Sequence, residues 1–168
     1  AGDSDAAAAL FAETLADAEA CAIDGFALAA RFGLLACAPP APSRGVAMAD
    51  LTGFTEKYGL NSRLVKQNGR LVEEVYKVGG KYDVQIRAVV SHLEAAQAFA
   101  THTMKEALAK LVQWYRTGED ADRKAYDIAW VNDKTSPVDT INGFIEVYLD
   151  ARGVKGSWEA LVYYVNRQ

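Results

Sequence analysis

Cysteine and histidine are scarce in this sequence, which limits both disulfide and metal chemistry. Its only cysteines are Cys21 and Cys37, and its only histidines are His92 and His102. The two cysteines could form one disulfide, but their spacing is not that of metal ligands, and we expect two buried or partly buried thiols in a cytoplasmic protein. The histidines stand ten residues apart. We expect them on the solvated surfaces of two helices and not on a shared metal.

Long apolar runs and an excess of positive charge are also missing. No uncharged apolar stretch reaches the roughly 18 residues that a membrane helix needs, so no membrane partner is expected. The net charge of −4 argues against nucleic acid as a partner, because phosphate binding needs clustered Lys and Arg. The alanine-rich beginning carries acidic residues, unlike a signal peptide, and it has no initiator methionine. We expect a processed, trimmed or excised chain.

The common catalytic motifs are absent as well. The sequence has no pair of histidines at zinc-binding spacing, no G-x-S-x-G elbow and no phosphate-binding glycine loop. The pair Gly79-Gly80 lacks the flanking strand and helix pattern and is interpreted as a hinge or turn. No reaction class follows from motifs of these kinds.

What the sequence does contain suffices for a core, since 51% of its 168 residues are hydrophobic. That length fits one domain or one lobe of a larger enzyme. Residues 1–36 form an alanine-rich segment, in which apolar residues spaced by three or four predict helix over residues 4–33. Residues 37–44 contain three prolines and predict a linker, because proline fixes φ and lacks a donor.

Residues 45–168 predict a mixture of helices and hairpins. A short helix is expected from Met48 to Tyr58, ended by Gly59. The pair Asn68-Gly69 stands between two strand-like runs, and a type I′ turn requires positive φ at both of its central residues. This pair therefore predicts a two-stranded hairpin.

Three helices are predicted after the hairpin. Apolar residues at helical spacing mark one helix over about residues 82–100 and another over about residues 104–115, closed by Gly118. The short connection between these two helices predicts antiparallel packing. Asp120 or Asp122 can cap a third helix that ends near residue 131.

The end of the chain predicts a second pair of strands. Residues 143–149 alternate apolar and polar side chains after a glycine, which indicates a strand. Residues 150–156 suit a turn, and residues 158–165 supply another apolar run. Its last four residues are strand-like, although residues 158–161 could equally begin a short helix. The fold class is therefore α+β, with a helical bundle portion and antiparallel β-hairpins.

Several motifs resemble those of a known family of enzymes. They are Pro-Val-Asp-Thr at 137–140, Gly-Phe-Ile-Glu at 143–146, Gly-Val-Ala-Met at 45–48, the run at 58–66, Val-Tyr-Lys-Val-Gly-Gly at 75–80 and Trp-Tyr-Arg-Thr-Gly at 114–118. Together they resemble the bacterial-type branch of the dipeptidyl peptidase III family over residues 45–168. The resemblance implies a lobe or fragment of a two-lobed peptidase.

Members of that family are zinc exopeptidases that remove dipeptides from the N-termini of short peptides. Their H-E-x-x-G-H motif is absent from this chain, so zinc is expected in the parent enzyme and none on this chain. The resemblance implies the substrate-binding portion of such an enzyme, with short peptides and the rest of its own parent chain as partners. The alternative is a stand-alone, non-catalytic module for peptide binding or assembly.

The resemblance also implies a substrate-binding site in which a peptide adds as a strand and acidic residues hold its ammonium group. Asp139 stands four residues before Gly143, where the family places an acidic residue. Asn142 could bond the peptide backbone, and Glu146 matches the glutamate of the Gly-Phe-Ile-Glu motif. The expected site is therefore Asp139, Asn142, Gly143 and Glu146, with no catalytic residue and no metal ligand.

Two observations qualify this expected site. Ile141 replaces a tyrosine that animal and fungal members use to assist the reaction, a replacement that bacterial-type relatives share. Asp139 could alternatively cap a turn after Pro137, and Glu146 could simply face solvent at the edge of a strand.

Overall fold

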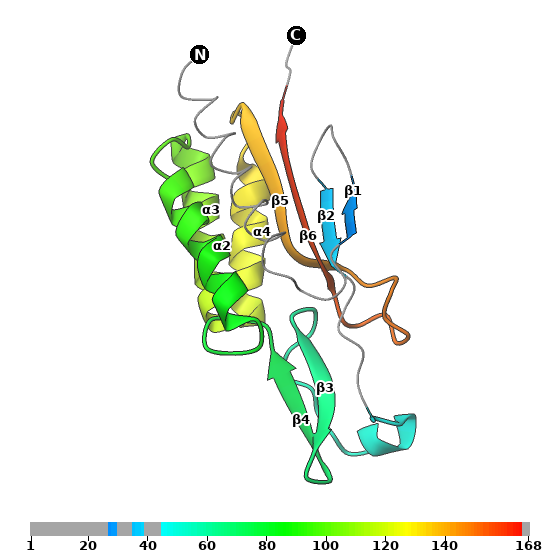
Figure 1. The fold of residues 1–168 in the computed structure, drawn as a ribbon. Helices are drawn as coiled ribbons and strands as arrows, with labels where there is room; N and C mark the ends of the chain where they lie inside the picture. The colour runs from blue at the N-terminus through cyan, green and yellow to red at the C-terminus, as the bar shows by residue number, and fades with distance from the viewer. Residues whose placement is uncertain (1–26, 30–34, 39–44, 166–168) are drawn as a thin grey trace.

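A computed structural model describes residues 27–29, 35–38 and 45–165 (Figure 1). In this part of the chain, four strands form an antiparallel sheet in the order β1-β2-β6-β5. Their bounds are Ala27–Ala29 for β1, Leu35–Ala38 for β2, Val138–Glu146 for β5 and Ser157–Tyr164 for β6. Strands β3 and β4 form a separate two-stranded sheet, and three α-helices lie beside the larger sheet (Figure 1).

Near the beginning of the chain, the structure corrects two expectations. Strand β1 occupies residues 27–29, where the sequence predicts helix, and β2 extends to residue 38, inside the predicted linker. Strand β1 pairs with β2, and β2 in turn pairs with β6 from the far end of the chain, so pairing within the sheet overrides the local helical pattern. The rest of the predicted helix and linker, residues 4–26, 30–34 and 39–44, lies outside the described residues.

The hairpin is confirmed as predicted. Strand β3 spans Ser62–Gln67 and β4 spans Arg70–Val75, with Gln67 opposite Arg70 at the turn. The two turn residues both have positive φ, 51° at Asn68 and 78° at Gly69. These values are those of a type I′ turn, whose twist matches that of the strands it joins.

The three predicted helices are also confirmed. They are α2 over Asp83–Ala96, α3 over His102–Thr117 and α4 over Asp120–Asn132. The hydroxyl of Thr101 accepts a hydrogen bond from Met104 N at 3.3 Å and so caps the start of α3. Gly118 ends α3 with a φ of 72°. Helix α2 ends at Ala96, earlier than its apolar pattern suggested.

The helix predicted from Met48 to Tyr58 is much shorter in the structure. Only Met48–Leu51 is helical, as a single 3₁₀ turn labelled η1. Gly53 follows with a φ of 79°, a conformation that a continuing helix does not contain. The chain then runs as an irregular loop into β3.

Strands β5 and β6 differ from expectation mainly in where they begin and end. Strand β5 begins at Val138 and ends at Glu146, where the sequence predicts residues 143–149. Its first residues lie before the predicted strand, and they pair with Tyr164, Tyr163 and Val162 on β6. Strand β6 is extended from Ser157 onward, which excludes the short helix at residues 158–161.

The apolar core lies between the helices and the sheet. Helix α3 supplies Trp114 and Tyr115, which are 2% and 1% exposed, and the Trp114 ring meets the Phe144 ring of β5 edge-on with centroids 6.1 Å apart. Other large members of the core are Tyr76, Ile86, Leu93, Leu108, Leu111, Tyr126 and Trp158.

Within the described residues, none of the helices is both long and apolar enough to span a membrane.

Candidate functional site

Strand β5 carries all four residues of the expected site. Because side chains alternate along a strand, its residues separate into two faces. Val138, Thr140, Asn142 and Phe144 are buried on the core face. Asp139 and Ile141 are half-buried on the opposite face, where their cross-strand partners are Tyr163 and Leu161 of β6. Asp139 and Asn142 therefore point away from each other.

The carboxylate of Asp139 is held by three hydrogen-bond donors. The indole nitrogen Nε1 of Trp130, on α4, donates to Oδ1 at 2.8 Å, and the backbone N–H of Thr140 donates to the same oxygen at 2.7 Å. The hydroxyl of Tyr163 donates to Oδ2 at 2.6 Å. The sequence placed Asp139 before the strand, whereas in the structure it lies inside β5. Contacts across the sheet and from α4 therefore orient its side chain.

Tyr163 remains protonated at neutral pH. Partial burial and the neighbouring Asp139 carboxylate raise the pKa of the Tyr163 phenol to about 12. Both causes act against formation of a phenolate, the first by removing water and the second by charge repulsion. The hydroxyl therefore keeps its proton and donates a hydrogen bond to Asp139.

Asn142 lies in the core and belongs to a chain of buried polar groups. Its side chain is 4% exposed, and Oδ1 accepts a hydrogen bond from the Tyr115 hydroxyl. The indole nitrogen of Trp158 donates to that same hydroxyl at 3.0 Å. Burial also raises the pKa of Tyr115 well above its ordinary value. The side-chain oxygen that we expected to face a peptide is thus bonded inside the protein.

Gly143 is required by its surroundings. Its φ is 147°, which side chains rarely adopt. A Cβ at this position would lie 3.0 Å from Cζ3 of Trp114 and 3.2 Å from Nη1 of Arg123. The same Arg123 nitrogen donates to the carbonyl of Phe144 at 3.2 Å, and the guanidinium lies 4.9 Å from the centroid of the Trp114 ring. Close approach of α3 and α4 to β5 therefore explains this glycine.

Glu146 is exposed at the far end of β5 from Asp139. Glu146 stands seven positions after Asp139 on the strand, which corresponds to about 23 Å along it. One ammonium group cannot contact both. The structure therefore separates the expected site into Asp139 on the half-exposed face, Asn142 and Gly143 toward the core, and Glu146 at the strand end.

Sequence analysis did not identify the residues that hold Asp139. Nothing in the spacing of Trp130 and Tyr163 along the sequence links them to Asp139. Trp130 is nine residues from Asp139 and Tyr163 is twenty-four residues from it. Only the packing of α4 and β6 around β5 brings the three side chains together.

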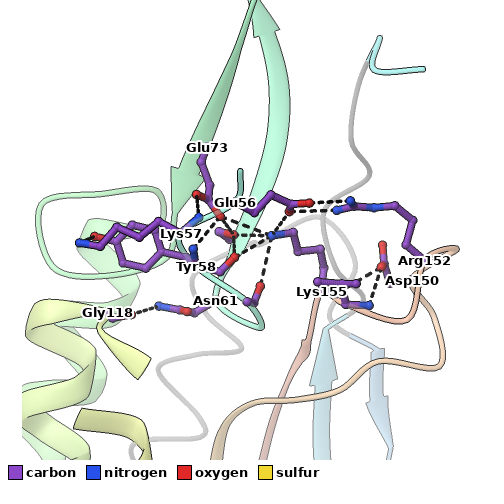
Figure 2. A network of polar contacts seen from close by, with 12 residues as sticks. Glu56, Lys57, Tyr58, Asn61, Glu73, Gly118, Asp150, Arg152 and Lys155 are labelled. Carbon is purple, nitrogen blue, oxygen red and sulfur yellow. Dashed lines mark hydrogen bonds and ion pairs between the residues drawn. The ribbon is translucent and has the colours of Figure 1, made fainter. Parts of the chain in front are cut away.

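A second cluster of polar side chains has no signal in the local sequence. It surrounds the ammonium group of Lys155, in the turn between β5 and β6 (Figure 2). Lys155 is 2% exposed, and its Nζ lies 2.6 Å from Glu56 Oε2 and 3.5 Å from Glu73 Oε1. It also donates to Ser62 Oγ at 2.7 Å and to the carbonyl of Tyr58 at 2.9 Å. We call this group the Lys155 cluster.

The Lys155 cluster joins three parts of the chain that are distant in sequence. Glu56 precedes β3, Glu73 lies on β4, and Lys155 precedes β6. Arg152 completes the cluster with two hydrogen bonds to the Glu56 carboxylate, of 2.6 and 3.0 Å. The hydrogen bonds from Arg152 are the main reason that the pKa of Glu56 falls to about 2. The cluster therefore ties the β3–β4 hairpin to the larger sheet.

The residues that the structure describes do not fit a zinc site. Among them, no group of three His, Cys, Asp or Glu side chains is placed to hold a metal ion. His102 is exposed at the start of α3, as expected, whereas His92 is half-buried on α2. No step of a reaction is therefore assigned to a metal on these residues.

Comparison with known proteins identifies relatives for most of the described chain. Residues 47–168 match the family model described as peptidase family M49. Dipeptidyl peptidase 3 of Rattus norvegicus is 36% identical over 89 residues, which are 52% of this chain and 12% of the rat protein. The same enzyme of Dictyostelium discoideum is 31% identical over 102 residues, 60% of this chain and 14% of that protein. The matched region is therefore about one eighth of these relatives.

Solved structures show the same fold. Dipeptidyl peptidase III from Caldithrix abyssi matches with a TM-score of 0.57 and 22% identity, over 64% of this chain and 20% of that one. The enzyme from Corallococcus sp. strain EGB matches with a TM-score of 0.59 and 21% identity, over 73% of this chain and 24% of that one. At these identities the likeness concerns the fold, and it confirms the α+β arrangement of helices and hairpins.

Proposed function

The chain belongs to peptidase family M49, and on that premise we propose that it forms the substrate-binding portion of a zinc exopeptidase of the dipeptidyl peptidase III type. In this proposal the enzyme removes dipeptides from the N-termini of short peptides. Asp139 binds the ammonium group of an extended peptide that lies along the half-exposed face of β5. The chain belongs to the bacterial-type branch, a placement that Ile141 supports because it replaces the tyrosine of animal and fungal members.

The orientation of the Asp139 carboxylate is the observation that carries this proposal. A half-buried carboxylate that accepts three hydrogen bonds has a fixed direction, because its donors hold both of its oxygens in place. An ammonium group that approaches it makes a charge-assisted hydrogen bond in partial shelter from water, where such bonds are strongest. A free peptide N-terminus carries that ammonium group at neutral pH, and an acetylated one does not.

Zinc belongs to this proposal only through the parent enzyme. The ligands and the general base would come from residues outside the described part of this chain, and zinc would supply an activated water there. The task of the described residues is to bind the peptide and to set its position.

A stand-alone peptide-binding module is the second candidate, because ammonium binding by Asp139 needs no metal. The intact mass of the native gene product separates the two candidates. A product several times longer than this chain supports the peptidase, and a mature product with the 18.2 kDa mass of this chain supports the module.

Calorimetric titration of the 168-residue chain with tetra-alanine and with N-acetyl-tetra-alanine tests the role of Asp139. Acetylation removes the ammonium, and Asp139→Asn removes the charge but keeps the shape of the side chain. Each change alone should weaken binding by about tenfold or more, which corresponds to about 1.4 kcal/mol or more. The two losses should not add, because both delete the same interaction.

Asp120→Asn is the matched control for this titration. Asp120 is exposed at the start of α4, so this variant loses the same charge outside the β5 face and should bind tetra-alanine as the wild type does. The proposal is wrong if acetylation still costs its full increment in the Asp139→Asn variant, since the ammonium is then held elsewhere. It is equally wrong if the wild type does not distinguish the two peptides.

A further inference from the structure

The two oxygens of the Asp139 carboxylate differ in how many acceptor positions remain open. A carboxylate oxygen accepts about two hydrogen bonds. Oδ1 already accepts two, from Trp130 Nε1 and from the backbone N–H of Thr140. Oδ2 accepts one from within the described residues, from the Tyr163 hydroxyl. The open position on this carboxylate is therefore on Oδ2, next to Tyr163.

The Tyr163 hydroxyl has acceptor capacity of its own at the same place. The hydroxyl uses its single proton in the hydrogen bond to Oδ2, and its oxygen lies 2.6 Å from that atom. A hydroxyl oxygen that donates its proton still accepts hydrogen bonds, and an ammonium group carries three donors. A group placed beside both oxygens can donate one hydrogen bond to each without displacing the bond between them.

Position in the sheet makes this pair of oxygens a suitable binding site. Asp139 and Tyr163 are direct cross-strand partners, so their side chains lie on the same face of the sheet, where Trp130 of α4 also reaches Asp139. Both are half-buried, which leaves them accessible but partly sheltered from water. The raised pKa of Tyr163 keeps the phenol neutral, so it adds no second negative charge that would attract metal ions indiscriminately.

We propose that the Tyr163 hydroxyl is a second binding residue for the peptide ammonium, which it holds together with Oδ2 of Asp139. The inference rests on the proposed function, because it assumes that Asp139 binds the ammonium. Trp130 and Thr140 contribute by occupying Oδ1, which leaves Oδ2 as the oxygen that meets the peptide. The site recognises a primary ammonium on an extended peptide, independent of the peptide's side chains.

Tyr163→Phe tests this inference, because it removes one oxygen and keeps the ring. Titration of this variant with tetra-alanine, which contains no lysine, should give an affinity about 3- to 10-fold lower than that of the wild type. Its affinity for N-acetyl-tetra-alanine should be unchanged, since that peptide has no ammonium to lose. A variant that was merely less well folded would lose affinity for both peptides.

Tyr164→Phe is the matched control. Tyr164 follows Tyr163 on β6, points to the opposite face and is 67% exposed. It loses the same hydroxyl with no contact to Asp139, so both affinities should match those of the wild type. Equal tetra-alanine affinity in the Tyr163→Phe and Tyr164→Phe variants would overturn the inference.

Failure of the inference differs from failure of the proposed function. If acetylation and Asp139→Asn both weaken binding but Tyr163→Phe does not, Asp139 alone holds the ammonium and only the role of Tyr163 falls. If the wild type binds both peptides equally, or neither, the role of Asp139 falls, and the role of Tyr163 falls with it.

A second measurement uses the wild-type sequence and does not depend on the folding of a variant. In protein labelled with ¹³C at tyrosine Cζ, the resonance of Tyr163 should shift when tetra-alanine is added and stay in place with N-acetyl-tetra-alanine. The resonance of Tyr164 should respond to neither peptide. A Tyr163 resonance that ignores tetra-alanine while the peptide binds would also overturn the inference.

Discussion

The ammonium nitrogen of Lys155 lies 2.6 Å from Oε2 of Glu56, and Lys155 is only 2% exposed. A buried lysine is stable as a cation only if its charge is paired and its donors are all used. Both conditions hold here, because Glu56 and Glu73 supply the charge and Ser62 and Tyr58 supply further acceptors. Removal of either Lys155 or Glu56 should therefore lower the free energy of unfolding.

Lys155→Met should lower the free energy of unfolding by about 3–5 kcal/mol. The substitution leaves the carboxylates of Glu56 and Glu73 without their buried cation, and removal of one partner from a buried pair costs about this much. Urea unfolding followed by circular dichroism measures the change. Lys66→Met is the control, because Lys66 pairs with Asp50 near the surface, with side chains 39% and 23% exposed, and should cost at most about 1 kcal/mol. Equal losses in the two variants would contradict the role of burial.

The pKa of Glu56 predicts how stability depends on pH. In the folded protein this pKa lies near 2, below its ordinary value of 4.5, chiefly because of Arg152. A lowered folded-state pKa means that the unfolded state binds the proton more readily. The contribution of Glu56 is therefore fully present above about pH 4.5 and is lost as the pH falls toward 2.

The difference in unfolding free energy between the wild type and Glu56→Gln isolates this contribution. It should be constant from pH 7 to about pH 5 and should shrink steadily below pH 4.5, as the wild type loses the charge that the variant never had. Urea titrations at a series of pH values measure it. A difference that grows as the pH falls would show that the pKa of Glu56 is raised and not lowered.

Gly69→Ala should destabilise the protein by about 1–2 kcal/mol, because a Cβ is unfavourable in the left-handed region. The φ of Gly69 is 78°, and a Cβ there would meet no atom within 4 Å, so backbone conformation is the sole cause of the loss. Thermal unfolding measures it. Gly59→Ala has equally open space without a positive φ, so it should change stability by less than about 0.5 kcal/mol. Unchanged stability in both variants would argue against the type I′ turn.

Tyr115→Phe should lower the free energy of unfolding by about 2–4 kcal/mol. It removes the hydroxyl that donates to Asn142 and accepts from Trp158, and so breaks two buried hydrogen bonds, and the loss of a buried hydrogen bond costs about 1–3 kcal/mol when nothing replaces it. Urea unfolding measures this loss, with Tyr164→Phe as a near-neutral control because that hydroxyl is on an exposed side chain. A loss below about 0.5 kcal/mol would mean that the two groups find other partners.

Local signals in the sequence predicted the parts of the fold that depend on a few adjacent residues. Asn68-Gly69 predicts the hairpin because only residues that tolerate positive φ form its turn. Gly118 and the apolar period before it predict the end of α3 for a similar reason. Such signals failed where partners from distant sequence supply the backbone hydrogen bonds. Strand β2 at residues 35–38 and the beginning of β5 at Val138, both paired with β6, are examples.

By itself, then, the sequence determined the α+β class and the family resemblance, and through that resemblance Asp139 as a candidate substrate-binding residue. Each depends on residue types and their spacing. Only the tertiary structure decided which groups surround that carboxylate. Trp130 reaches it from α4 and Tyr163 reaches it across the sheet, and no local preference brings these residues together. The burial of Lys155 was decided in the same way, because its charge is tolerated only where the folded chain brings Glu56 and Glu73 to it.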